Sequence, residues 1–98
     1  MLESKFQSGL IKEIKSLLPG SVVMKGDANY IQGFPDLIVF YEDRWGTLEC
    51  KKDAKAKHRP NQDYWVETLG KMSYSAFINP DNKEEILHDL VRSLKRDA

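Results

Sequence analysis

Three charged side chains stand out because they occupy two otherwise apolar stretches of the chain. Asp36 stands directly before one stretch, and Glu49 and Lys51 lie two residues apart in the next. Side chains two apart on a strand share a face, so Leu48 and Cys50 point the opposite way, into a core. Charged groups on a face that could be apolar are costly unless they pair or hold a metal ion. Two carboxylates beside a lysine suit a hard divalent cation, with a positive charge left for a phosphate or a water.

This convergence depends on how the two stretches pair. We predict a hairpin of strands 36–41 and 47–52, joined by a turn over residues 42–46. Asp36 then shares a face with the other two charged residues only if directly opposed residues have numbers that sum to an odd value, or if a bulge corrects the register. The competing interpretation is a surface Glu–Lys pair and an unrelated Asp that caps a turn.

The order of these residues resembles that of the PD-(D/E)XK nucleases, in which an Asp is followed at some distance by Glu-x-Lys. The flanking residues narrow the resemblance to the VRR-NUC branch, found as stand-alone phage or bacterial proteins and as nuclease domains of larger repair enzymes. The residues that carry it are Glu3, Phe6, Gln7, Gly33, Pro35, Asp36, Glu49, Lys51, Gln62 and Trp65. The resemblance covers residues 2–80. This ordered set of residues is much more specific than an Asp followed by Glu-x-Lys alone.

The resemblance implies a metal centre. Asp36 and Glu49 would bind Mg²⁺ or Mn²⁺, with the Cys50 backbone carbonyl as a further ligand and Glu3 acting through water or on a second ion. Helical periodicity supports Glu3, which lies near the middle of the apolar stripe of a helix predicted over residues 1–18. The alternative is that Glu3 is exposed in the first turn, where it favours the helix dipole.

The resemblance also gives roles to Lys51 and Gln62. The lysine would orient the attacking water or stabilise the pentacovalent transition state, and both options stay open. Gln62 would position the scissile phosphate or the lysine, unless it is an ordinary amide on a helix surface. A basic segment follows Lys51 and contains Lys52, Lys55, Lys57 and Arg59. Such segments are usually just solvated, but beside a site of this kind we expect contacts to phosphates.

Composition fits a single folded domain over residues 1–98. Hydrophobic residues make 41% and charged residues 31%, an ordinary balance for a folded protein. The net charge is zero, so attraction to nucleic acid must come from local segregation of charge. There is no signal-peptide pattern and no apolar run of membrane-spanning length. The single Cys favours a reducing compartment, so we expect a cytoplasmic protein of a bacterium, or of a host cell if phage-encoded.

The predicted fold class is α/β, a restriction-endonuclease-like core with a mixed four-stranded sheet flanked by helices. The elements follow the order α-β-β-β-α-β-α, with helix 1–18, strands 21–25, 36–41 and 47–52, helix 60–69 ended by Gly70, strand 72–78, and a helix from the 80s into the 90s. Asp81 and Glu84 have the spacing of a capping box for that last helix.

These features together predict a metal-dependent DNA endonuclease, selective for branched DNA such as a four-way Holliday junction and acting in DNA repair. Two symmetric cuts need two sites, so we expect a homodimer that associates through the first or the last helix. The alternatives are a flap or nicking nuclease and a catalytically inactive DNA-binding module on the same scaffold. A restriction-type enzyme is disfavoured because no specificity domain fits in 98 residues.

Overall fold

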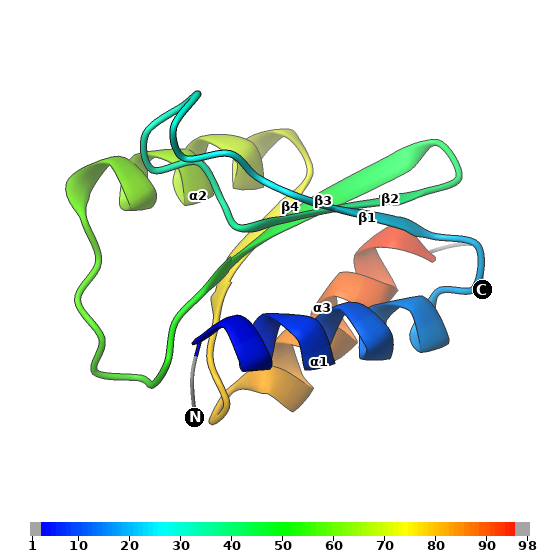
Figure 1. Ribbon diagram of the computed structural model, residues 1–98. Coiled ribbons are helices and arrows are strands. Elements are labelled where there is room, and N and C mark those ends of the chain that lie inside the picture. Colours follow the sequence, from blue (N-terminus) through cyan, green and yellow to red (C-terminus); the bar gives the residue numbers. More distant parts are fainter. Residues whose placement is uncertain (1–2, 96–98) are drawn as a thin grey trace.

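A computed structural model describes residues 3–95 as one four-stranded sheet with helices on both faces (Figure 1). The elements are α1 (Glu3–Leu17), β1 (Val22–Lys25), β2 (Leu37–Tyr41), β3 (Arg44–Cys50), α2 (Pro60–Met72), β4 (Tyr74–Ile78) and α3 (Lys83–Leu94). This order and the mixed sheet confirm the predicted fold class. The part of the predicted first helix at residues 1 and 2 lies outside the described residues. No helix within residues 3–95 is both long and apolar enough to cross a membrane.

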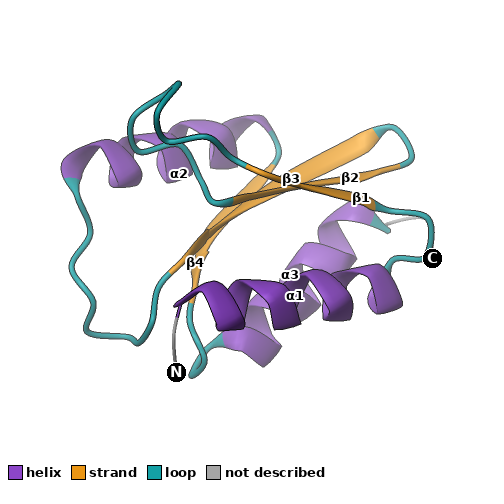
Figure 2. Ribbon diagram, in the orientation of Figure 1, coloured by secondary structure: helices purple, strands orange, loops and turns teal. Residues whose placement is uncertain are grey.

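The strands follow the spatial order β1-β2-β3-β4. The first three form an antiparallel meander, while β4 pairs parallel to β3 and is reached through α2. Figures 1 and 2 show α1 and α3 together on one face of the sheet and α2 on the other. The end of β3 therefore opens between α2 and the first turn of α1.

The hairpin between β2 and β3 is tighter than predicted. The strand expected from residue 47 already begins at Arg44, which pairs with Tyr41, so the turn, whose length the sequence does not fix, needs only two residues. Glu42 takes a positive φ of 56° to close it. Gly46, which looked like part of the turn, lies inside β3, where a Cβ atom would come within 2.8 Å of the Leu90 side chain. The glycine makes room for α3 rather than for a turn.

Two helix boundaries also differ from the predictions. Helix α2 continues through Gly70 to Met72, and Ser73 alone connects it to β4. The predicted capping box at the start of α3 was also wrong, because the N-cap residue is Asn82 and not Asp81. The Asn79 side chain instead accepts hydrogen bonds from the backbone N–H groups of the two residues before the helix, Asp81 and Asn82.

The core lies between the sheet and the pair α1 and α3. It is formed by the apolar stripes of both helices and by the inward residues of the central strands: Phe6, Leu10, Ile14, Leu37, Val39, Leu48, Cys50, Leu87, Leu90 and Leu94. Leu48 and Cys50 are fully buried, as predicted from strand alternation. Both helices therefore direct most of their apolar residues toward the sheet.

Candidate active site

The pairing of β2 with β3 has the register that the predicted site requires. Leu37 lies opposite Leu48 and Ile38 opposite Thr47, so opposed residues have numbers that sum to an odd value. One step beyond Leu37, the Asp36 Oδ2 atom accepts a hydrogen bond of 2.8 Å from the backbone N–H of Cys50. Asp36 is thereby fixed beside the end of β3.

Glu49 is buried in an environment that disfavours its charge. Its side chain is 3% exposed, although it carries an ionisable group. Burial, followed by the neighbouring carboxylate of Asp36, raises the pKa of Glu49 to about 8. Its Oε1 atom is buried and has no hydrogen-bond partner within residues 3–95. A buried carboxylate oxygen without a partner is costly, and a bound cation would remove that cost.

Gln62 joins Glu49 to Lys51. Its Nε2 atom donates to Glu49 Oε2 over 3.0 Å, and its Oε1 atom accepts from Lys51 Nζ over 2.7 Å. The same Oε1 atom accepts from the backbone N–H of Arg59 over 3.0 Å, which closes the first turn of α2. The amide is thus held from three sides, with its nitrogen on an acceptor and its oxygen on two donors.

Lys51 is held in place directly after β3. Its backbone N–H donates to Ile78 of β4, and its Nζ atom donates to the Lys57 carbonyl over 3.1 Å as well as to Gln62. Nζ also lies 4.0 Å from Glu49 Oε2. The lysine is 9% exposed, so its charge stands beside the two carboxylates and away from bulk solvent.

Glu3 reaches the same place from α1. It lines a hollow of about 440 Å³ together with Asp36, Glu49 and Lys51. It is exposed in the first turn of the helix and is not part of the buried apolar stripe. Glu13, the other acidic residue of this helix, forms an ion pair of 2.7 Å with Lys83 of α3.

Few side chains of the described residues are placed to bind a metal ion. Among the side chains of residues 3–95, no group of three or more His, Cys, Asp and Glu residues is arranged to hold a metal ion. What the structure brings together is a pair of carboxylates, Asp36 and Glu49, with Glu3 on the rim and the backbone of Cys50 between them.

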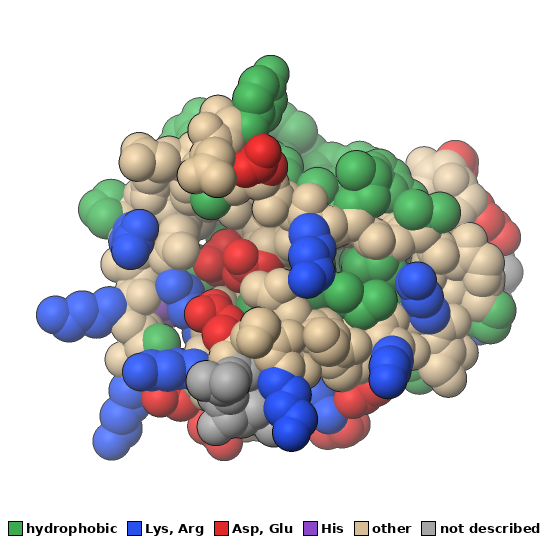
Figure 3. Space-filling model, in the orientation of Figure 1, with side chains coloured by type: hydrophobic (Ala, Val, Ile, Leu, Met, Phe, Trp, Pro, Cys, Tyr) green, Lys and Arg blue, Asp and Glu red, His purple; other side chains and the backbone are tan. Residues whose placement is uncertain are grey.

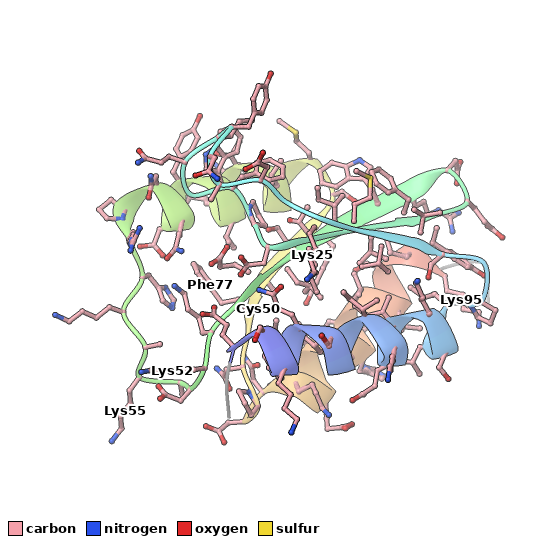
Figure 4. All side chains as sticks on the ribbon, viewed as in Figure 1. Lys25, Cys50, Lys52, Lys55, Phe77 and Lys95 are labelled. Carbon is pink, nitrogen blue, oxygen red and sulfur yellow. The ribbon has the colours of Figure 1, made fainter. Side chains whose placement is uncertain are left out.

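The basic segment forms one wall of this hollow. Lys52, Lys57 and Arg59 line it, whereas Lys55 does not. Figure 3 shows Lys and Arg side chains around the exposed carboxylates on this face, and Figure 4 shows Lys55 pointing outward from the loop. The segment is anchored by His58, whose ring stacks on Phe77 at 3.7 Å and contacts Asp63.

Sequence reasoning missed a group of amides on the other side of the carboxylates. Asn29, Gln32 and Asn61 line a second hollow of about 330 Å³, which also includes Asp36 and Glu49. Nothing in the sequence singles out any of the three. The three come from the loop before β2 and from α2, so no spacing in the sequence connects them.

The sheet order and the helices on both faces define a restriction-endonuclease-like fold, and Asp36, Glu49 and Lys51 lie together at the end of β3. The structure is similar to that of a VRR_NUC domain protein, with a TM-score of 0.69 and 17% identity over 97% of this chain and 89% of that one. It is also similar to Hjc, a Holliday junction resolvase from the archaeal hyperthermophile Archaeoglobus fulgidus, with a TM-score of 0.53 and 13% identity over 78% of this chain and 67% of that one. No family model and no curated protein sequence matches the chain. The predicted resemblance is thus confirmed at the level of the fold.

Proposed function

We propose that the chain is a single-domain endonuclease that hydrolyses DNA phosphodiester bonds with the help of Mg²⁺ or Mn²⁺. The observation that carries the proposal is the convergence of Asp36, Glu49 and Lys51 at the open end of β3, where Gln62 joins Glu49 to Lys51. A lysine buried beside two carboxylates adds little to the stability of the fold, because the ammonium and the carboxylates all lose their hydration. The same arrangement suits a reaction in which negative charge develops on a phosphate.

The residues present fit a hard cation. Asp36 and Glu49 would hold it, the Cys50 carbonyl would add an oxygen ligand, and Glu3 would act through water or on a second ion. The unpartnered Oε1 atom of Glu49 is the observation that favours this assignment. When bound, the ion lowers the pKa of a water and neutralises charge on the phosphate.

Lys51 would act on the substrate itself. Hydrogen bonds to Gln62 and to the Lys57 carbonyl occupy two of the three N–H groups on Nζ. We assign the third to a non-bridging phosphate oxygen or to the attacking water. Gln62 fixes the direction of this donor and holds Glu49 at the same time, so it is a positioning residue in this mechanism.

The proposed substrate is branched DNA. The neighbour Hjc is described as a Holliday junction resolvase, which favours a four-way junction here. We further propose a role in DNA repair, in the cytoplasm of a bacterium or of a phage-infected cell. Paired cuts in a junction require two active sites, so the working unit would be a homodimer. A flap or nicking nuclease and an inactive DNA-binding module remain the alternatives.

The test is cleavage of a set of end-labelled DNAs: a four-way junction, a flap, a nicked duplex and an intact duplex. Each is incubated with Mg²⁺, with Mn²⁺ or with a chelator. We expect metal-dependent cleavage, fastest on the junction, and none by Glu49→Gln. Junction binding without cleavage in either metal would identify an inactive module, and preferred cleavage of the flap or the duplex would identify the other alternative.

A further inference from the structure

The two hollows that meet at the carboxylates have different walls. The first is lined by Lys52 and Lys57 of the basic segment, and the second by the loop between β1 and β2 and by the first turn of α2. Both include Arg59 and Gln62 besides the two carboxylates. A DNA strand whose phosphate lies at the carboxylates therefore has a basic surface on one side and a different surface on the other.

That different surface is rich in amides. Asn29, Gln32 and Asn61 line it, and Phe34 adds an aromatic ring. A carboxamide offers two donors and an acceptor but no charge. Phosphates are contacted by Arg and Lys and also by amides, whereas base edges carry donors and acceptors side by side, which Asn and Gln match. Arg59, which this hollow shares with the first one, is the only cation among the described residues that line it, against the three amides named above. The chemistry of this hollow therefore favours a nucleobase over a second phosphate.

The hollow is also built firmly. Gly33 has a φ of 82°, and a Cβ atom there would lie 2.7 Å from the Asn61 side chain, so the loop packs on α2 only because this residue has no side chain. The ring of Phe34 lies edge-on against Trp65 of α2, with 5.5 Å between centroids. At its base the loop is closed by a backbone hydrogen bond of 2.8 Å from Gly26 to Asp36. The same loop therefore carries the amides and adjoins a carboxylate of the candidate site.

We propose that the amide-lined hollow binds the nucleobase next to the scissile phosphate, so that cleavage depends on which base stands there. This inference rests on the proposed nuclease function. It adds that the enzyme reads one flanking nucleotide through Asn29, Gln32 and Asn61, although it selects its substrate mainly by backbone shape. The volume of the hollow, about 330 Å³, lies within the range of roughly 300–1,000 Å³ typical of small-molecule sites.

The test uses a series of forms of the cleaved substrate, in which each of the four bases or an abasic residue is placed in turn on one side of the cut and then on the other. A good base contact is worth about 1–3 kcal/mol, so we expect the abasic residue on one side to lower kcat/KM about tenfold. In the double variant Asn29→Ala, Gln32→Ala, the ratio of kcat/KM for the substrate with a base to kcat/KM for the abasic substrate should fall to about one. Tyr30→Ala is the matched control, because Tyr30 belongs to the same loop but is 83% exposed and does not line the hollow.

The outcomes separate the inference from the function on which it rests. A wild-type protein that cleaves no DNA overturns the proposed function. A protein that cleaves every form equally overturns only the base-binding hollow, and this comparison needs no variant to fold. If Tyr30→Ala also abolishes the base dependence, the effect belongs to the loop as a whole and the assignment to the hollow is wrong.

Discussion

Glu49 is the residue whose surroundings most clearly favour a bound cation, and this makes a prediction about pH. In the metal-free native state its pKa is raised to about 8 by burial and by Asp36, whereas the unfolded chain ionises it near 4.5. Between these values the unfolded state binds fewer protons than the native state, so the free energy of unfolding falls as the pH rises. We expect the Tm of the metal-free protein to be lower at pH 8 than at pH 5.5.

Thermal unfolding followed by circular dichroism measures this effect. For a domain of this size, a decrease of 1 kcal/mol in stability lowers the Tm by about 4–8 °C. Glu49→Gln should remove most of the pH dependence between 5.5 and 8, and Mn²⁺ should offset it in the wild type. Glu13→Gln is the control, because Glu13 is paired with Lys83 outside the site. Equal pH dependence in the wild type and in Glu49→Gln would contradict the assignment.

Substitutions of the two carboxylates and of the lysine should affect metal binding and cleavage differently. Asp36→Asn and Glu49→Gln are expected to weaken Mn²⁺ binding and to abolish cleavage. Lys51→Ala should lower the single-turnover rate about 10²–10³-fold, as removal of a donor to a developing charge does, while Mn²⁺ binding persists. Calorimetry with Mn²⁺ and single-turnover cleavage measure the two properties. Failure of Lys51→Ala to bind Mn²⁺ would show that the lysine organises the ion site instead.

At the scale of elements, the strands were the most predictable part. Alternation along one strand placed Leu48 and Cys50 in the core, and the need to bring Asp36 to Glu49 allowed only one parity of register. The ends of the elements were less predictable, because Gly46 and Gly70 look like breakers in the sequence. Gly46 instead makes room for a packed helix, and Gly70 lies within α2.

The amide-lined hollow shows where sequence reasoning stops. Asn29 and Gln32 become neighbours of Asn61 only because the loop before β2 packs on the first turn of α2 at Gly33. This close approach is a tertiary contact between segments far apart in the sequence. No local propensity or periodicity encodes it.

The two acidic residues Glu3 and Glu13 of α1 point in different directions, which leads to a further prediction. Glu3 lines the hollow with the carboxylates, whereas Glu13 forms an ion pair with Lys83. Glu3→Gln is therefore expected to lower cleavage activity at least tenfold, and Glu13→Gln less than twofold. The larger effect is expected at Glu3 because it lies near the charged groups of the candidate site. Initial rates on the preferred substrate measure both. The reverse order would mean that Glu3 is only a first-turn residue that favours the helix dipole.

The basic segment predicts a graded response to salt. Lys52 and Lys57 line the hollow and Lys55 does not, although all three are exposed. Replacing Lys52 or Lys57 by Gln should lower the slope of log affinity against log salt by about 0.9 for each phosphate that is no longer neutralised. Lys55→Gln should change this slope less. Fluorescence anisotropy at several salt concentrations, with Ca²⁺ in place of Mg²⁺, gives the slopes. Equal slopes for the wild type and all three variants would show that the segment is merely solvated.

At the scale of the whole molecule, the exposed apolar surface is not where it was expected. Most apolar residues of α1 and α3 are buried against the sheet, although Leu17 of α1 is exposed. Large exposed apolar side chains lie instead on the face of β1 and β2 opposite that core, among them Val22, Met24 and Phe40. Val22 pairs with Phe40, and Met24 pairs with Ile38, so these residues form one surface across the two strands.

This surface changes the prediction about the homodimer. Contact through α1 and α3 would bury Leu17 and the hollow that it lines with Leu87 and Val91. Contact through the outer face of β1 and β2 would bury the paired apolar side chains of two strands, and a two-fold axis there lets the same patch meet itself. Cuts in both strands of a junction also require two copies of the site at a fixed separation. We therefore expect Met24→Lys to shift the protein from dimer to monomer. Leu17→Lys, at an exposed apolar residue of α1, should leave the mass unchanged.

Light scattering at micromolar concentration, with and without a four-way junction, measures the assembly. Specific interfaces usually bury about 1,200–2,000 Å² in total, and a charge at the centre of an apolar patch is left without a partner on association. Met24→Lys should therefore also convert paired cuts into single nicks, because each monomer carries one complete site. If the wild type has the mass of one chain even with the junction bound and leaves unpaired nicks, the dimer is wrong. The function then moves to a flap or nicking nuclease that acts on one strand at a time.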